Sequence, residues 1–284
     1  METVAIVGVG LIGGSFARAL RDRAGFRGRI LGVSRPEYVT AAVAAGVVDE
    51  AASLESALAK ADLVYLSGSI SSILANIETV DRFVRNGTLI TDAGSTKSQI
   101  MAKARQSIKK GVFIGGHPMA GKEVRGAEAA DPNLFVGRNY FLCLPDSPGA
   151  QASNFVTLVS EIGAVPQPIA AEEHDRIVAY SSHLPQLAST VLAATVETHL
   201  GGKLTRKGAG SGIIDMTRLA LSGYDNLWRD ILDTNRAEVR IALDSFIETL
   251  SVARRSLDSD PSDPVREQFE LGQKLAKDLR KRED

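Results

Sequence analysis

The sequence predicts an α/β protein, with an N-terminal Rossmann-type, doubly wound parallel sheet and an all-helical C-terminal domain. Three observations lead to this prediction. From Thr3 to about Ile169, short apolar runs alternate with helical patterns, which is typical of parallel strands joined by crossover helices. A glycine-rich turn follows the first apolar run. After Pro168, only helical periodicity remains.

The length and composition agree with two folded domains. The 284 residues suffice for two domains of about 150 residues each, which we expect to span 1–168 and 169–284. Hydrophobic residues make up 44% and charged residues 24% of the chain, which argues against a disordered, collagen-like or coiled-coil protein. Because the formal net charge is −1, we expect neither nucleic acid nor a membrane surface as a partner.

The N-terminal apolar runs are the expected strands. They are residues 4–7, 30–33, 63–66, 89–91, 112–114, 140–144 and 165. Between the first two runs, Leu11, Phe16 and Leu20 form the apolar stripe of a helix. A strand, a glycine-rich turn and a helix therefore follow one another directly at the start of the chain.

The C-terminal part contains the expected helices, residues 172–199, 213–221, 226–256 and 264–282. The stretch from Ile177 to Val196 has no Asp, Glu, Lys or Arg and is long enough to span a bilayer, but it holds several polar residues, so we expect a buried helix. Pro185 removes one helical N–H and frees the carbonyl of Ser181, which predicts a polar kink at His183.

The cysteine usage and the N-terminus favour a cytoplasmic protein. Cys143 is the single cysteine, and it has no Cys or His neighbour at a zinc-ligand spacing, so we expect neither a disulfide nor a metal site. A signal peptide is not expected, because residues 3–7 already form a strand pattern.

The first glycine-rich turn has the pattern of a dinucleotide-binding loop, with Gly8, Gly10 and Gly13 between a strand and a helix. The first glycine permits a tight turn, the second lets the backbone approach a pyrophosphate, and the third lets the helix pack on the strand. The helix start, with Leu11 and Ile12, presents free N–H groups to the anion. The alternative is a glycine-rich turn that binds no ligand.

The residues after the second strand favour NADP over NAD. NAD-binding proteins usually carry an Asp or Glu there to bind the ribose 2′-hydroxyl, whereas this chain has Ser34 and Arg35. A hydroxyl and a guanidinium can bind a 2′-phosphate, which a carboxylate would repel. The alternative is that Arg35 is a solvated turn residue and that cofactor selectivity lies elsewhere.

The chain has four histidines, and two of them are candidates for proton transfer. His117 follows a strand, so we expect it on a loop at the carboxyl edge of the sheet, where such folds bind ligands. His183 lies at the polar kink, where a ligand or a water molecule would satisfy the freed groups. For His174 we expect surface ion pairing, and for His199 a place at a helix C-terminus.

Five segments resemble, in order and spacing, the prephenate/arogenate dehydrogenase family of tyrosine biosynthesis. They are Gly8 to Gly13, Asp92 to Lys97, Gly115 to Gly121, Ser182 to Gln186 and Asp215 to Arg218. The third and fourth segments are specific as a pair, whereas the glycine pattern alone fits many dehydrogenases. The resemblance covers residues 3 to about 250. It implies a Rossmann domain, a helical domain that forms a homodimer, and NAD(P)-dependent oxidative decarboxylation of prephenate or arogenate.

The resemblance also implies roles for single residues. His117 would hydrogen-bond the ring hydroxyl and take its proton as hydride leaves, with Ser95 assisting. Arg218 would bind the ring carboxylate, and His183 and Trp228 would line the substrate side-chain region. General chemistry agrees, because hydride loss from a carbinol carbon needs a base on its oxygen and a carboxylate favours a guanidinium. The alternatives are a surface ion pair for Arg218 and a core ring for Trp228.

Two cations follow the His117 segment and could contact the substrate side chain. Lys122 and Arg125 would favour the keto acid prephenate over the amino acid arogenate, since the prephenate side chain carries no compensating positive charge. The sequence does not decide between the two substrates.

Two other functions remain open. A β-hydroxyacid-type dehydrogenase would use a catalytic lysine on the long helix, but residues 172–199 contain no lysine. A non-catalytic, NADP-sensing protein would have no need for Ser95, His117 and Arg218 together.

Overall fold

The computed structural model describes the chain except residues 125, 146–148, 202–207, 258–262 and 282–284. It divides into two compact units, residues 1–236 and 237–284, and each is described by itself. The domain boundary expected near residue 168 stays a prediction.

The first unit is built on one sheet of eight strands over the described residues, in the order β3-β2-β1-β4-β5-β6-β7-β8. The strands are β1 Thr3–Val7, β2 Arg29–Val33, β3 Glu50–Ala51, β4 Leu63–Leu66, β5 Leu89–Asp92, β6 Val112–Pro118, β7 Asn139–Cys143 and β8 Val165–Pro168. The order reverses beside β1, as in a doubly wound fold, which confirms the predicted fold class. The sequence missed β3, because two residues are too few for a hydrophobic pattern.

The sheet is mostly parallel, not wholly parallel as expected. β6 and β7 pair antiparallel, while β7 and β8 pair parallel to each other. A parallel return from β6 would need a crossover across the sheet, usually through a helix. In the described part of this connection, the structure instead has only the short 3₁₀ turn Ala127–Ala129.

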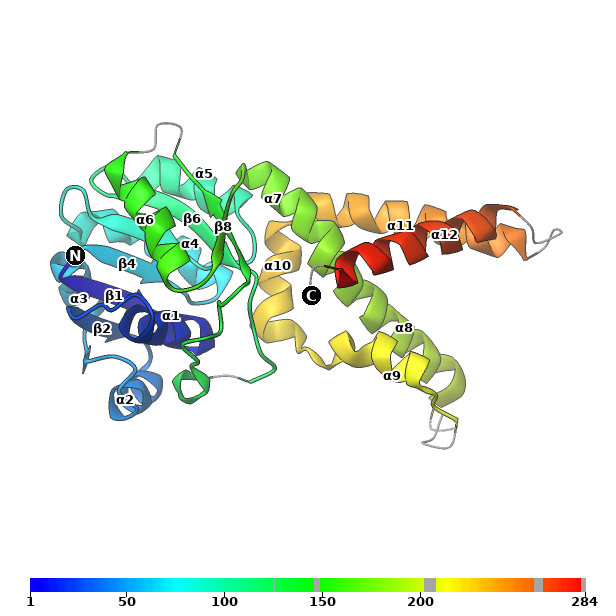
Figure 1. Ribbon diagram of the computed structural model, residues 1–284, viewed down its shortest axis with the longest axis horizontal. Helices are drawn as coiled ribbons and strands as arrows, with labels where there is room; N and C mark the ends of the chain where they lie inside the picture. The colour runs from blue at the N-terminus through cyan, green and yellow to red at the C-terminus, as the bar shows by residue number, and fades with distance from the viewer. Residues whose placement is uncertain (125, 146–148, 202–207, 258–262, 282–284) are drawn as a thin grey trace. The chain divides into compact units, whose positions relative to one another are not determined.

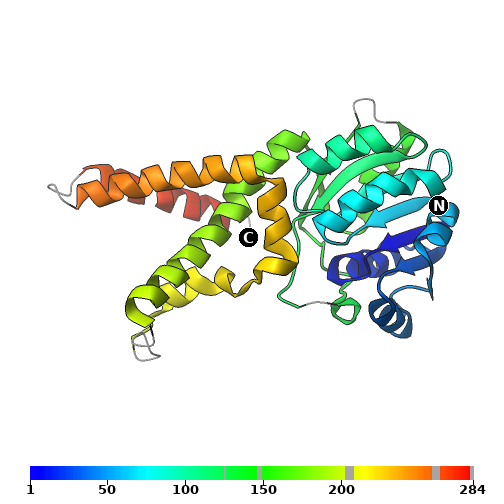
Figure 2. The same ribbon diagram turned by 180° about the vertical axis from the view of Figure 1, so that it is seen from behind.

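Helices cover both faces of the sheet (Figures 1 and 2). They are α1 Leu11–Asp22, α2 Pro36–Ala44, α3 Leu54–Lys60, α4 Ile70–Phe83, α5 Ser98–Ser107 and α6 Ala150–Glu161. Side chains alternate along β1, with Val4 and Ile6 packing in the core beside α1 and α6, and Ala5 and Val7 in the core beside α3, α4 and α5.

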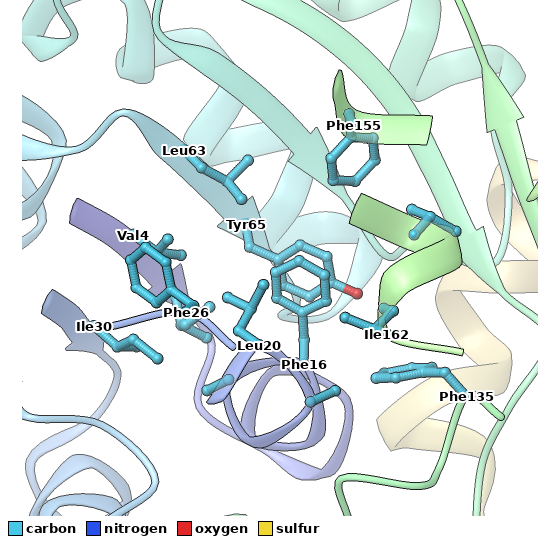
Figure 3. Packing of buried hydrophobic residues seen from close by; sticks show 14 of the residues in the cluster. Val4, Phe16, Leu20, Phe26, Ile30, Leu63, Tyr65, Phe135, Phe155 and Ile162 are labelled. Atoms are coloured by element: carbon cyan, nitrogen blue, oxygen red, sulfur yellow. The ribbon is translucent and has the colours of Figure 1, made fainter. Parts of the chain in front are cut away.

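The core between α1, α6 and the sheet contains a stacked aromatic pair. Phe16 of α1 lies parallel to Tyr65 of β4, with ring centroids 3.9 Å apart (Figure 3). The Tyr65 hydroxyl is 3.0 Å from that of Tyr140, so both buried hydroxyls are hydrogen-bonded. This packing holds the helix that follows the glycine-rich turn firmly on the sheet.

Helices complete the first unit after β8. They are α7 Ala171–Val178, α8 Leu184–Leu200, α9 Ser211–Thr217 and α10 Arg229–Thr234. The π turn Ala179–His183 separates α7 from α8, directly before Pro185. The helix expected over residues 172–199 is therefore interrupted where the proline predicts a kink.

The helix α8 is not buried over its length, so the expectation for residues 177–196 is wrong for the single chain. Val191 is 58% exposed and Leu200 is 48% exposed, whereas Gln186 and Ser189 are buried. Among the described residues, no helix combines the length and the apolar character needed to cross a membrane. The second unit consists of most of α11 Arg236–Ser256 and of α12 Asp263–Arg280.

Candidate active site

The glycine-rich turn has the geometry that the sequence predicts. Gly8 has φ +100°, and its N–H donates to the Val33 carbonyl at 2.8 Å. A Cβ at Gly8 would lie 2.6 Å from the Gly68 nitrogen, and a Cβ at Gly13 would lie 2.4 Å from the Gly8 carbonyl oxygen. Both positions therefore require glycine for close backbone packing.

Gly10 differs from these two glycines, because among the described residues other than its chain neighbours no heavy atom lies within 4 Å of the place where its Cβ would be. It precedes α1, whose first turn starts at Leu11 and Ile12 and contains no acidic residue. The first N–H groups of a helix lack partners within the helix and attract anions. The turn therefore fits the pyrophosphate of a dinucleotide.

Ser34 and Arg35 lie between β2 and α2, where a ribose is bound in dinucleotide-binding folds. The Arg35 side chain is 72% exposed, and its Nε is 3.6 Å from Oε1 of Glu37. Its guanidinium carbon lies 4.6 Å from the centre of the Tyr38 ring. Arg35 is thus accessible to a phosphate, which would compete with Glu37 for it.

His117 lies within β6, and not on the loop after it as expected. Parallel pairing between β5 and β6 ends at Ile114, and His117 instead pairs with Phe141 of the antiparallel strand β7. The strand thus continues past the carboxyl edge of the parallel sheet. His117 still lies at the ligand-binding edge, because pairing with β7 lets β6 continue past the last residue that pairs with β5.

His117 belongs to a hydrogen-bonded row of side chains. Its Nδ1 is 2.8 Å from Nε2 of His174, and Nδ1 of His174 is 2.8 Å from Oδ1 of Asp175. The same carboxylate accepts the backbone N–H groups of Lys97 at 2.7 Å and Ser98 at 2.8 Å. His174 is wholly buried and Asp175 is 2% exposed, so the expected surface ion pairing of His174 is wrong.

The sequence contained a signal for this burial. Ala171, His174, Asp175 and Val178 are the buried residues of α7, at the spacing of one helix face. The alanine and valine on that face indicate that His174 and Asp175 point inward. The charged residues around them, Glu172 and Glu173, favoured a surface interpretation instead.

Burial and neighbouring charges keep these histidines neutral. Burial, followed by repulsion from His174, Lys97 and His183, lowers the pKa of His117 well below its usual value. Burial also lowers the pKa of His174, and the hydrogen bond to Asp175 offsets only part of this effect. Burial raises the pKa of Asp175, but hydrogen bonds from His174, Ser98 and Lys97 outweigh it, so that its pKa lies below normal.

A buried ion pair between Lys97 and Asp92 supports the loop between β5 and α5. The Asp92 carboxylate also accepts the N–H of Gly94 at 2.7 Å and that of Gly116 at 3.0 Å. These bonds tie the loop to the strand that carries His117, and they satisfy a carboxylate that burial would otherwise penalise. Ser95 lies on this loop and is partly buried.

His183 and Trp228 come together on the helical side of the first unit. The two rings meet edge to face with centroids 6.0 Å apart, and Trp228 Nε1 donates to Ser222 Oγ at 2.9 Å. Asn235 Nδ2 donates to the Asp175 carbonyl at 2.8 Å and lies 3.2 Å from His183 Nδ1. Asn235, which the sequence analysis missed, thus connects His183 to the His117 row.

Two of the three predicted substrate-side cations, Arg218 and Lys122, lie on the surface. Arg218 NH1 is 3.3 Å from Oε1 of Glu123, and both side chains are more than 60% exposed. Lys122 Nζ is 2.7 Å from Asp131 Oδ2. Arg218 therefore contacts a residue six positions after His117, but neither cation belongs to the hydrogen-bonded row. Arg125 lies outside the described residues.

Two family models match the chain. Residues 16–166 match the model described as "Prephenate dehydrogenase, nucleotide-binding domain", and residues 170–271 match "Prephenate dehydrogenase, dimerization domain". Among curated proteins, the prephenate dehydrogenase of Lactococcus lactis is 33% identical over 279 residues, covering 97% of this chain and 77% of that protein. The cyclohexadienyl dehydrogenase of Zymomonas mobilis is 29% identical, covering 95% and 94%.

Solved structures agree with these matches. The Aquifex aeolicus prephenate dehydrogenase, in complex with hydroxyphenyl propionate and NAD+, superposes with a TM-score of 0.90 at 28% identity and covers 98% of each chain. The Synechocystis arogenate dehydrogenase has a TM-score of 0.82 at 28% identity and covers 99% of each chain.

Proposed function

The chain belongs to the prephenate dehydrogenase family, and from this premise we propose that it catalyses the NAD(P)-dependent oxidative decarboxylation of prephenate or arogenate. The observation that carries the proposal is His117, which is hydrogen-bonded to His174 and whose pKa burial lowers, at the carboxyl edge of a sheet with a dinucleotide-binding turn. Prephenate would yield 4-hydroxyphenylpyruvate, and arogenate would yield tyrosine.

The proposed chemistry uses His117 as a general base. Its free ring nitrogen accepts the proton of the ring hydroxyl while the carbinol carbon loses hydride to the nicotinamide. The bond from the ring to its carboxylate then breaks, CO₂ leaves, and the electron pair makes the ring aromatic. Because aromatisation drives the second step, the protein needs no further acid or metal for it.

The remaining site residues bind and orient the substrate in this proposal. Ser95 assists at the ring hydroxyl, Arg218 binds the ring carboxylate, and His183 and Trp228 line the side-chain region. Lys122 contributes positive charge near that region. Asn235 donates toward His183 Nδ1, so a neutral His183 presents an Nε2–H donor to the substrate.

The activity is tested by following nicotinamide reduction at 340 nm with prephenate and arogenate against NAD and NADP. Replacing His117 with Asn removes the base and is expected to lower kcat about 10² to 10⁴-fold. His199→Asn is the matched control, because His199 is exposed near the end of α8. Turnover of neither substrate by the wild type, or unchanged turnover in the His117 variant, would contradict the proposal.

For the cofactor, we propose that NADP is preferred over NAD. The support is that the Arg35 side chain is exposed and stacks on Tyr38. In addition, the residue before it is Ser34 and not an Asp or Glu. One charge-assisted pair to the 2′-phosphate, about 1.5 to 3 kcal/mol, corresponds to a preference of roughly ten- to a hundred-fold. Because Glu37 competes for the guanidinium, we expect the preference to lie toward the lower end of this range.

The cofactor test is the ratio of kcat/KM for NADP and NAD. The double change Ser34→Asp with Arg35→Ile adds repulsion and removes attraction, so we expect the ratio to reverse. Arg27→Ile, at an exposed position before β2, is the control and leaves the ratio unchanged. A wild type that prefers NAD, or a ratio that the double change leaves in place, would refute the preference.

A further inference from the structure

We propose that His174 and Asp175 are positioning residues that fix the tautomer of His117, so that its Nε2 is unprotonated and faces the substrate hydroxyl. The inference rests on the proposed function only for the role of that nitrogen in catalysis. The tautomer itself follows from the hydrogen-bonded row and can be tested without any reaction.

An ionised carboxylate has no proton to donate, so the Asp175 side chain can only accept hydrogen bonds. Asp175 accepts the N–H groups of Lys97 and Ser98 with its two oxygens, at 2.7 and 2.8 Å. These donors hold it as an anion. His174 Nδ1, 2.8 Å from Oδ1, must therefore carry the proton in this bond.

The number of protons on the two rings fixes which nitrogen donates and which accepts. A neutral imidazole carries one N–H, so a proton on Nδ1 of His174 leaves its Nε2 as an acceptor. Nδ1 of His117 lies 2.8 Å from this nitrogen and must be the donor. Nε2 of His117 then keeps a free lone pair, which is the form that a general base requires.

The surroundings keep both rings neutral before the reaction. His174 is wholly buried, which disfavours a charge on it. The groups that face His117 include His174 of α7, His183 of the π turn and Lys97 before α5, and Lys97 is itself paired with Asp92. When His117 accepts the proton, its Nδ1–H remains bonded to His174, and the Asp175 anion stabilises the new charge through that ring.

The row is also held in place at its far end. Lys97 and Ser98 form the start of α5, so their N–H groups and the helix dipole both favour the Asp175 carboxylate. Asn235 Nδ2 donates to the backbone carbonyl of Asp175 at 2.8 Å. Rotation of the carboxylate is therefore restricted, which a positioning residue requires.

The first experiment observes the tautomer directly in the full-length chain without substrate or cofactor. ¹⁵N-labelled histidine gives separate signals for protonated and unprotonated ring nitrogens, and the chain has four histidines. The His117 signals are those lost in His117→Asn. We expect a proton on Nδ1 and none on Nε2 at neutral pH. A proton on Nε2 of His117 would overturn the proposal, whatever the outcome of the activity assay.

The second experiment compares Asp175→Asn with Asp81→Asn. Asp81 likewise accepts two backbone N–H groups, from Lys110 at 2.8 Å and Gly111 at 3.3 Å, but bonds no histidine in the described contacts. We expect Asp175→Asn to lower kcat about 10² to 10⁴-fold with little change in KM, by analogy with the aspartate of a serine protease triad. Asp81→Asn is expected to leave kcat unchanged.

The pH profile separates positioning from a merely structural role. Without the negative charge, protonation of His117 is less favourable, so the acid limb of kcat/KM shifts to lower pH in Asp175→Asn. A structural defect would lower activity and leave the limb in place, and that outcome counts against the proposal. An unchanged kcat in Asp175→Asn would also count against the proposal.

A pair of substitutions at His174 gives an independent check if Asp175→Asn folds poorly. The Gln amide oxygen in His174→Gln can still accept from Nδ1 of His117, whereas His174→Phe offers no acceptor. We expect the Gln variant to retain at least ten times the kcat of the Phe variant at similar KM. Equal kcat in the two variants would refute the role of His174.

Discussion

Within the part of the chain that the structure describes, the Arg218 side chain pairs with one residue, Glu123, at the surface. Its partner Glu123 lies 3.3 Å away, and both side chains are largely exposed. Such pairs contribute about 0 to 1 kcal/mol, so a substrate carboxylate can displace Glu123 at little cost. The guanidinium geometry, rather than the charge alone, would then determine binding.

We therefore predict that Arg218→Lys raises KM ten-fold or more for prephenate and arogenate alike, with a smaller effect on kcat. The charge is kept but the two parallel hydrogen bonds to a carboxylate are lost, at about 1.5 to 3 kcal/mol. Steady-state kinetics check this prediction. Arg240→Lys, whose partner Asp244 is 3.9 Å away and which is 83% exposed, is the control. An unchanged KM would leave Arg218 as a surface ion-pair residue.

At the level of single residues, the sequence could identify His117 but not the groups that orient it. His117 follows the apolar run 112–114, so its place near the sheet edge follows from the fold class, although the structure includes it in β6. His174 and Asp175 are 57 and 58 positions away and meet it only through tertiary packing. Asn235 comes from yet another helix end, and no local pattern predicts a contact over that distance.

The π turn Ala179–His183 shows how a sequence feature, the following proline, leads to a buried histidine with a lowered pKa. It precedes Pro185 and places the His183 ring inside the first unit, with 1% exposure. Burial lowers the pKa of His183 to about 4, while Asp175 partly opposes this shift. The buried ring is therefore neutral near pH 7 and resists protonation.

This burial predicts acid-sensitive stability. The folded-state pKa of His183, about 4, lies below its usual value of 6.5. Burial of the neutral ring therefore contributes fully to the stability of the folded chain above pH 6.5, and this contribution is lost as pH falls toward 4. We expect the free energy of unfolding to drop by about 2 kcal/mol from this residue between about pH 7 and 5. The carboxylates whose pKa is lowered, such as Asp62 and Asp81, act in a separate window below 3.8.

Urea unfolding at several pH values checks this prediction. His183→Gln keeps an acceptor for Asn235 but no ionisable ring, so its stability should depend less steeply on pH between about 4.5 and 7. The exposed His199 provides the control, since His199→Gln should follow the wild-type curve. Parallel pH curves for wild type and His183→Gln would show that the acid sensitivity arises elsewhere.

Other elements show how far local pattern predicts the fold. Apolar runs located the main strands, because strands buried on both faces are continuously hydrophobic. The pattern gave no strand direction, so the antiparallel pairing of β6 and β7 was missed. The pattern also led to the wrong prediction that α8 is buried within its own chain. An apolar helix face has the same sequence pattern whether its own chain or a second copy covers it.

Each unit of the molecule exposes apolar side chains that a single copy does not cover. In the first unit, Val191 of α8, Ile214 and Met216 of α9 and the following Leu221 are 58 to 81% exposed. In the second unit, the exposed residues include Ile241, Ile247, Leu250, Phe269, Leu271 and Leu275. Clusters of this kind mark interfaces more often than free surface, and they fall in or next to the region that matches the dimerization domain, residues 170–271.

We therefore predict a homodimer that buries these faces against a second copy. Sedimentation should report about twice the chain mass of 30.2 kDa. Ile214→Glu with Leu221→Glu places charges on two residues that are 60% and 81% exposed, so it should leave the folded chain intact and yield a monomer. Val43→Glu, on α2 and outside the matched dimerization region, is the matched control and should remain dimeric. A wild type that is monomeric at micromolar concentration would contradict the prediction, because the exposed apolar faces would then need another explanation.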